Sequence, residues 1–178
     1  MPLLPPSPQH VQVLCALVHC TRHKQLRRGR ALHARILVTG SFSSTQIANT
    51  LINLYAKCNH FSKANLVFDC INNKDVVSWN CLINAFSQQQ AHAPSLHVMH
   101  LFRQLMMAHK TIVPNAHTFT SVLTAASTLS DARADRQAHA LSVKTACSHY
   151  VFAPSSLLNM CYKMGFVSEA RELFDEMP

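Results

Sequence analysis

Acidic residues are missing from the first part of this 178-residue chain. The first carboxylate is Asp69, whereas eight lysines and arginines precede it, and the whole chain has a formal charge of +8. This balance favours an anionic partner but carries no information about the fold. Glycine is also scarce, with three residues, while 48% of the residues are hydrophobic. That combination favours helices with an extended core over disorder or tight hairpins.

Paired cysteine motifs and long apolar runs are absent as well. The seven cysteines are an odd number and form no Cys-x-x-Cys pair, so we expect reduced thiols rather than a disulfide framework. No apolar run reaches the ~18 residues of a membrane span, so membrane insertion is not expected. Residues 1–9 form a leader without the charged start and apolar centre of a secretory signal, and no transit peptide is clearly visible in it.

Catalytic signatures are missing too. The sequence has no Gly-rich phosphate loop and no nucleophile elbow. It also lacks the His-x-Glu and Pro-Cys-x-x-Cys elements of a zinc deaminase. His97 and His100 lie one helical turn apart, but no cysteine or carboxylate stands near them at zinc spacing, which favours packing over metal binding. We therefore expect no enzymatic activity, cofactor or metal.

Helical periodicity is what the chain does contain. One apolar face is predicted for a helix around residues 47–57, formed by Ile47, Leu51, Ile52, Leu54 and Tyr55. Asn59 follows and tolerates the left-handed geometry of a helix end. Ser62 is then predicted as the N-cap of a second helix. The apolar residues of that helix are Ala64, Leu66, Val67, Phe68 and Ile71. Such a short pair cannot bury its own face, which predicts stacked neighbours.

The chain also repeats itself at an offset of 106 residues. Leu51 aligns with Leu157, Asn53 with Asn159, and Phe68 with Phe174, and the same offset serves an earlier block around His33 and His139. We therefore predict helix–turn–helix units at residues 10–44, 45–75, 76–115, 116–150 and 151–178. The expected fold is all-α, a right-handed solenoid of stacked repeats.

The third unit has distinctive features. Its first helix is expected to face the core through Trp79, Leu82, Ile83 and Phe86. The polar residues 88–93, followed by Pro94, predict an enlarged loop. Pro114 should end the unit, because proline cannot continue a helix. The second helix is expected to supply Leu96, Met99, Leu101, Phe102, Leu105 and Met106.

These segments resemble the pentatricopeptide repeats of the plant PLS class, in which long, short and ordinary variants alternate. The ordinary unit 76–115 opens with VVSWNCLINAF, and the short unit 45–75 contains NTLINLYAKC and SKANLVFDCI. LRRGRALHARILVTG resembles the second helix of a long unit, expected at 10–44 and again at 116–150. SSLLNMCYKMGFVSEARELFDEMP resembles a second, truncated short unit. The deaminase region that often follows such repeats is not part of the resemblance.

The resemblance implies sequence-selective binding of single-stranded RNA in mitochondria, or alternatively chloroplasts, with about one base read per repeat. It further implies recognition of sites for RNA modification, such as cytidine-to-uridine editing, with a deaminase or editing factor supplied in trans. In the family, the fifth and last residues of a unit read the base and the second residues of adjacent units sandwich it. The implied base-reading residues are Asn49, Asp75, Asn80, Asn115, Thr120 and Ser155. The implied sandwich residues are Gln46, Val77, His117 and Phe152.

Side-chain chemistry agrees with a role for Asn49 and Asp75 as one base-reading pair. The resemblance associates Asn49 with Asp75 as a uracil-reading pair, and Asn80 with Asn115 as a pyrimidine-reading pair. Uracil has an N–H between two carbonyls, and Asn offers a donor and an acceptor while ionised Asp only accepts. The alternative is that Asn49 and Asp75 serve only as helix-start and cap residues.

Other assignments also stay open. Arg27, Arg28 and Arg30 are expected either to contact phosphates, which position RNA without specifying its sequence, or to form a solvated helix face. A protein-interaction scaffold of the tetratricopeptide type would share the predicted architecture. A truncated product with little activity is a further alternative, because the chain stops inside a repeat and solenoids depend on terminal caps.

Overall fold

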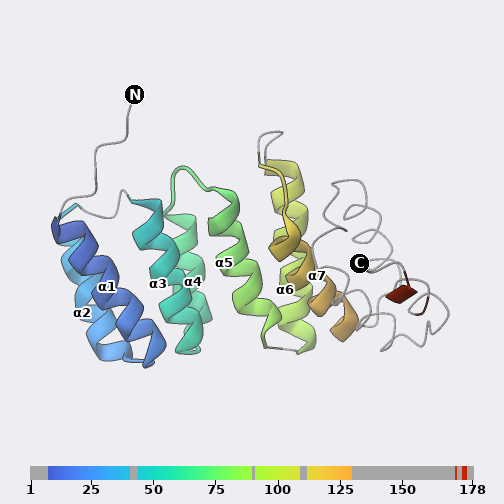
Figure 1. The fold of residues 1–178 in the computed structure, drawn as a ribbon, viewed down its shortest axis with the longest axis horizontal. Helices are drawn as coiled ribbons and strands as arrows, with labels where there is room; N and C mark the ends of the chain where they lie inside the picture. Colours follow the sequence, from blue (N-terminus) through green and yellow to red (C-terminus); the bar gives the residue numbers. More distant parts are fainter. Residues whose placement is uncertain are drawn as a thin grey trace. The chain divides into compact units, whose positions relative to one another are not determined.

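A computed structural model describes residues 8–40, 44–89, 91–108 and 112–129, together with residues 171, 174 and 175. Every regular element within these ranges is an α-helix, as the all-α prediction required (Figure 1). The helices are α1 (Pro8–Arg22), α2 (Leu26–Val38), α3 (Thr45–Lys57), α4 (Phe61–Asp69), α5 (Val76–Ser87), α6 (His92–Ala108) and α7 (Ala116–Leu129).

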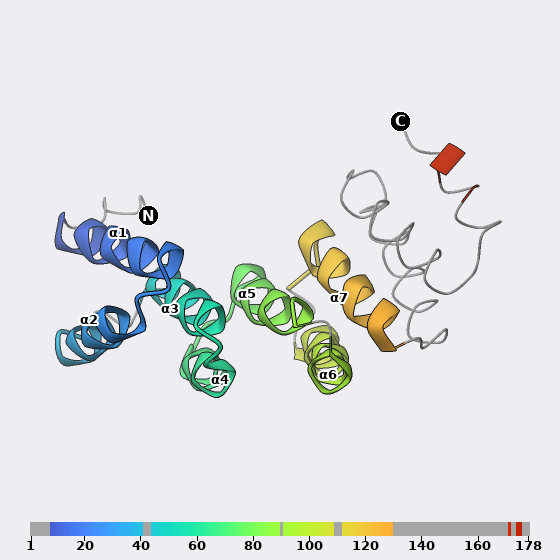
Figure 2. The same ribbon diagram turned by 90° about the horizontal axis from the view of Figure 1, so that it is seen from below.

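The chain divides into two compact units, residues 1–82 and 83–178, and the division falls inside α5. In the first unit α1 pairs with α2 and α3 pairs with α4, while α3 also packs against α1. Figure 2 shows α1 and α3 in one layer and α2 and α4 in the other. In the second unit α6 packs against α7. Within the first unit, α1 to α4 therefore cover their apolar faces with one another, which a single short pair could not do.

The two turns in the first unit share one geometry. Lys24 and Asn59 adopt positive φ angles of 51° and 60° after α1 and α3 respectively. The backbone N–H of His60 donates to the carbonyl of Tyr55 over 2.8 Å, and that of Asn59 donates to Ala56 over 2.9 Å. These two bonds are those of a Schellman C-cap, which satisfies the last carbonyls of a helix. The left-handed conformation predicted for Asn59 is confirmed.

The core of the first unit is built around α3. The five apolar residues predicted for this helix, from Ile47 to Tyr55, are all buried, and Leu17 of α1 and Ile36 of α2 are buried as well. Phe68 of α4 meets the ring of Trp79 edge to face, with centroids 4.8 Å apart. Burial of each such side chain stabilises the fold by roughly 1.5–3 kcal/mol, so packing rather than intrinsic helix propensity holds this unit together.

One glycine marks a close approach between two helices. Gly29 is buried in the middle of α2 and faces α3. A Cβ atom at this position would overlap the side chain of Leu54, which is itself fully buried. Glycine in a helix interior costs about 1 kcal/mol relative to alanine. The tight contact between α2 and α3 explains why it is used here.

The second unit has its own buried layer. Phe102 of α6 and Phe119 of α7 meet edge to face, with ring centroids 5.9 Å apart. Leu105 and Leu123 are fully buried beside them. Figure 1 shows α6 and α7 packed along one another, as their contacts require. The apolar faces of these two helices therefore cover each other.

Several sequence predictions were wrong in detail. Ser62 does not cap α4, because the Schellman turn brings the chain back into helix at Phe61, with His60 before it. Residues 88–93 do not all form a loop, since α6 begins at His92 and Pro94 lies in its first turn, where no backbone N–H is required. Leu66, Leu96 and Met106 do lie on the second helices as predicted, but their side chains are more than 40% exposed.

Candidate functional site

A polar stripe runs along one face of α3. Gln46, Asn49 and Asn53 recur at three- and four-residue spacing, so they share a face of the helix. Gln46 is exposed, whereas Asn49 is only 7% exposed. The Oδ1 atom of Asn49 is buried and accepts no hydrogen bond from the described residues. An unpaired buried acceptor is unfavourable by about 1–3 kcal/mol, and this oxygen has almost no surface open to a ligand.

Asn53 continues this stripe one turn further along α3 and reaches α5. Its Nδ2 lies 3.5 Å from the sulfur of Cys81, to which it donates a weak hydrogen bond. Burial raises the pKa of the Cys81 thiol, and the bond from Asn53 opposes that rise. Sequence reasoning did not assign a role to Asn53. The available signal was its alignment with Asn159 in the internal repeat.

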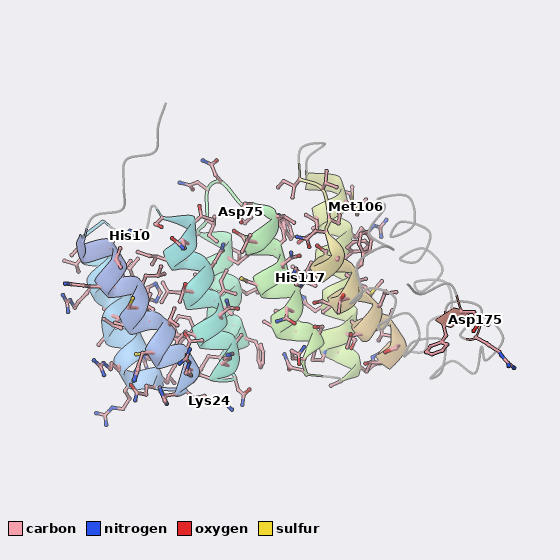
Figure 3. The ribbon with its side chains drawn as sticks, viewed as in Figure 1. His10, Lys24, Asp75, Met106, His117 and Asp175 are labelled. Carbon is pink, nitrogen blue, oxygen red and sulfur yellow. The ribbon has the colours of Figure 1, made fainter. Side chains whose placement is uncertain are left out.

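On α5, as on α3, an exposed residue is followed three residues later by a more buried polar one. Val77 is 51% exposed, although it is apolar, and Asn80 is half-buried one turn later. Asp75, at the start of α5, is exposed (Figure 3). Within the first unit the structure therefore places the predicted residues at two helix starts, Gln46 and Asn49 on α3 and Asp75 and Val77 at α5.

The second unit carries the equivalent positions on α7. His117 is exposed and Thr120 is half-buried one turn later. The Thr120 hydroxyl donates to the carbonyl of Ala116 over 2.8 Å, which leaves its oxygen only as an acceptor. Asn115 is half-buried immediately before α7. Ser155 and Phe152 lie outside the described residues.

Asp75 and Asn115 act as helix caps. The backbone N–H of Ser78 donates to Asp75 Oδ1 over 2.7 Å, and that of Thr118 donates to Asn115 Oδ1 over 3.2 Å. A carboxylate at a helix N-terminus is also favoured by the helix dipole. Asp75 therefore caps α5, while Asn49 lies inside α3 and caps nothing.

The residues predicted to contact phosphates lie elsewhere in the first unit. Arg27, Arg28 and Arg30 are exposed on α2, which belongs to the layer opposite α3 (Figure 2). Arg30 lies close enough to Tyr55 to oppose the rise in the pKa of that phenol caused by burial. The arginines therefore form a basic surface on α2 and do not adjoin the polar stripe of α3.

The histidines on α6 are packed rather than arranged for metal. His97 meets Phe86 with ring centroids 4.4 Å apart, and its ring centre is 6.4 Å from that of His100. Burial lowers the pKa of His97, followed by the charge of His100. In the part of the chain that the structure describes, no three His, Cys, Asp or Glu side chains converge as metal ligands, and no helix there is long and apolar enough to cross a membrane.

Comparison with known proteins identifies the repeats. Residues 47–76 and 153–178 match the family model of the PPR repeat, and the two matches begin 106 residues apart. A pentatricopeptide repeat-containing protein of Arabidopsis thaliana is 40% identical over 172 residues, covering 97% of this chain and 23% of the relative. The chain belongs to the plant pentatricopeptide repeat family. In pentatricopeptide terms, α3 and α4 form the repeat matched by the first segment.

Other pentatricopeptide repeat proteins also match most of this chain. A putative mitochondrial one of Arabidopsis thaliana is 34% identical and covers 89% of this chain and 24% of the relative. A chloroplastic one of Arabidopsis thaliana is 30% identical, and the match covers 96% of this chain and 20% of the relative. The crystal structure of the pentatricopeptide repeat protein PPR10 from maize superposes with a TM-score of 0.66 at 16% identity, over 90% of this chain and 23% of that one. This chain thus has the helical-repeat fold and spans about a quarter of the length of the relatives it matches.

Proposed function

We propose that this chain binds single-stranded RNA along the N-terminal halves of α3, α5 and α7. The observation that carries the proposal is a shared register. On each helix an exposed side chain, Gln46, Val77 or His117, is followed one turn later by a partly or fully buried polar one. Bases stack on the outer positions and hydrogen-bond to the inner ones, Asn49, Asn80 and Thr120. Ser155 and Phe152 are the corresponding residues of the last repeat.

The first unit supplies one complete candidate base site. Gln46 and Val77 flank the base, and Asn49 and Asp75 face its hydrogen-bonding edge. The exposed carboxylate of Asp75 accepts a hydrogen bond from the base, and the amide of Asn49 supplies a donor. One acceptor together with the Asn49 amide donor suits uracil, which has one N–H between two carbonyls. Asn80 and Asn115 are the equivalent pair for a neighbouring pyrimidine, most often cytosine.

The cellular role follows from the family. Relatives include mitochondrial and chloroplastic proteins, and we propose that this chain acts in one of these organelles. Its role there is to recognise sites of RNA modification, such as cytidine-to-uridine editing, with the deaminase supplied in trans. Stacking provides about 1–3 kcal/mol per base in single-strand binders. A few bases therefore give weak binding, and further repeats or partners add affinity.

The test is fluorescence anisotropy with labelled single-stranded homopolymer RNAs of the four bases, measured on the full chain at about 50 and 200 mM salt. We expect pyrimidine RNAs to bind best at both salt concentrations. Asn49→Ala should lower the preference for uracil, whereas Asn73→Ala, an exposed asparagine in the loop before α5, should leave it unchanged. Equal binding of all four RNAs that vanishes with salt would overturn base recognition and favour a protein-interaction scaffold.

A further inference from the structure

Side chains from three helices of the first unit meet at one phenol. Tyr55 of α3 is 3% exposed, and its oxygen lies 2.8 Å from Nδ1 of His33 on α2. The two rings meet edge to face, with centroids 5.7 Å apart. The ammonium group of Lys63 on α4 lies over the Tyr55 ring, 6.0 Å from its centroid. Side chains of α2 and α4 therefore converge on α3 at this point.

A second cation reaches the same point from α2. Arg30 stands one turn before His33, so the two side chains share a face of the helix. Burial raises the pKa of the Tyr55 phenol, and the charge of Arg30 opposes that rise. Burial, and then the charge of Lys63, lower the pKa of His33. Both charges therefore act on the pair formed by His33 and Tyr55.

The sequence supplies no carboxylate near these two cations. Residues 1–82 contain only two acidic side chains, Asp69 and Asp75. Asp69 follows Lys63 by six residues on α4, outside the three- or four-residue spacing at which helical side chains pair. Asp75 caps α5 through Ser78. Positive charges gathered without a counter-charge raise the local concentration of anions, so this point favours an anionic ligand.

The phenol faces away from the polar stripe of α3. Tyr55 follows Gln46 by nine residues, which is about two and a half turns of an α-helix. The two side chains therefore lie on opposite faces of α3. Arg30 and Lys63 belong to α2 and α4, which form the layer opposite α3 (Figure 2). An anion bound by these cations is thus separate from a base bound at Gln46.

We propose that Arg30 and Lys63 form a binding site for a phosphate group beside the pair of His33 and Tyr55. The guanidinium of Arg30 offers a planar fork of donors that matches two phosphate oxygens, and Lys63 adds a compact positive charge. Arg30 is exposed and Lys63 is half-buried, so a ligand from solvent can reach both. The site does not depend on the proposed function, because a free phosphate compound and a phosphate of an RNA strand share this chemistry.

The experiment follows the ring signals of His33 by nuclear magnetic resonance of the full chain while inorganic phosphate is added. Their loss in His33→Gln identifies these signals, and exchange of chloride for phosphate keeps the ionic strength and pH constant. We expect a saturable shift of the His33 signals. Arg30→Gln and Lys63→Gln should each weaken the apparent affinity roughly tenfold or more, as expected for a hydrogen bond to a charged group. Lys63→Arg keeps the charge and should retain binding.

Arg35→Gln and Lys57→Gln are the matched controls, because they remove the same kinds of charge from exposed positions of α2 and α3. Affinity should stay within about twofold in both, since exposed charges away from the ligand are screened by salt. A shift that does not saturate, or that all four variants reduce equally, would overturn the site and leave a general basic surface. Circular dichroism melting reports folding, and the exposed Arg30 tests the site even if Lys63→Gln does not fold.

A second titration identifies the source of the phosphate, with a short single-stranded RNA in place of inorganic phosphate. A shift of the His33 signals by RNA that is lost in Arg30→Gln assigns the site to an RNA phosphate. RNA binding that leaves these signals in place, while inorganic phosphate shifts them, assigns it to a free phosphate compound. If neither ligand shifts them, the site is overturned, whatever base preference the anisotropy measurements show. Absence of base preference, in turn, would overturn the proposed function and leave this site standing.

Discussion

His33 of α2 and Tyr55 of α3 meet through a hydrogen bond of 2.8 Å between the imidazole Nδ1 and the phenol oxygen. The two rings lie edge to face, with centroids 5.7 Å apart. Burial, and then the charge of Lys63, lower the pKa of His33 below its ordinary value of 6.5. The folded first unit therefore favours the neutral imidazole at this contact.

This contact predicts a loss of stability in acid. In the unfolded chain His33 binds a proton as the pH falls through about 6.5, whereas the folded chain binds it only at a lower pH. The unfolded state thus holds more protons in this window. The free energy of unfolding therefore decreases as the pH decreases. Urea unfolding at about pH 7.5 and 5.5 should show a smaller fall for His33→Gln than for the unmodified chain. His23→Gln, at an exposed position, is the control. Equal falls in all three proteins would contradict the prediction.

Gly29→Ala should destabilise the first unit, although alanine is the better helix former. The new methyl group would overlap the buried side chain of Leu54, and overpacking of a core typically costs about 1–3 kcal/mol. The gain in helix propensity offsets about 1 kcal/mol of this. Thermal denaturation followed by circular dichroism measures the net effect. The matched reverse change, Ala34→Gly at an exposed position of α2, should also destabilise, by about 1 kcal/mol. A rise in melting temperature for Gly29→Ala would refute the close approach of α2 and α3.

Two neighbouring residues of α4 should respond very differently to truncation. Phe68 is 3% exposed and packs on Trp79, whereas Leu66 is 63% exposed. Phe68→Ala should lower the free energy of unfolding by about 3–5 kcal/mol, and Leu66→Ala should change it by no more than about 0.5 kcal/mol. Trp79 is the single tryptophan of the chain, so its fluorescence during urea unfolding reports on this region. Similar losses for the two variants would mean that α4 packs through another face.

Thiol reactivity should follow burial and pKa. Alkylation requires the thiolate, and burial raises the pKa of Cys81, while Cys15 and Cys70 are exposed. Iodoacetamide at about pH 7.5, below the ordinary thiol pKa, should therefore modify Cys15 and Cys70 well before Cys81, as followed by peptide mass spectrometry. Asn53→Ala removes the hydrogen bond that favours the Cys81 thiolate, so it should slow labelling of Cys81. Labelling of Cys81 as fast as that of Cys70 would contradict the described packing.

The basic surface of α2 gives a prediction on salt dependence. Replacement of Arg27 and Arg28 by alanine should weaken all RNAs alike and reduce the slope of log affinity against log salt by about 0.7 for each phosphate that is no longer neutralised. Base preference should not change, because binding to phosphates carries no sequence information. Anisotropy titrations at several salt concentrations measure both quantities. An unchanged slope would assign these arginines to a solvated face, as their place on the layer opposite α3 permits.

Local signals in the sequence predicted much of this fold. The 3.6-residue period identified every buried apolar residue named for α3, and the tolerance of asparagine for positive φ identified the turn at Asn59. Both depend on interactions within a few residues. The positions proposed for base recognition came from repeat register, and the structure adds that Asn49 is buried with an unpartnered oxygen. Boundaries were less accurate at Ser62 and at residues 88–93, where neighbouring turns decide how soon a helix resumes.

By itself, the sequence determined that the chain is helical, that it repeats, and which residues stand at equivalent places in each repeat. These properties are periodic and therefore readable from residue spacing alone. Tertiary structure alone decided which apolar side chains are covered, so that Phe68 is buried and Leu66 is not. It also decided that Gly29 meets Leu54 and that His33 meets Tyr55, since each pair joins residues distant in the chain. The physical reason is that burial and its effects on pKa depend on which helix packs against a given face, and residue spacing within one helix does not specify that neighbour.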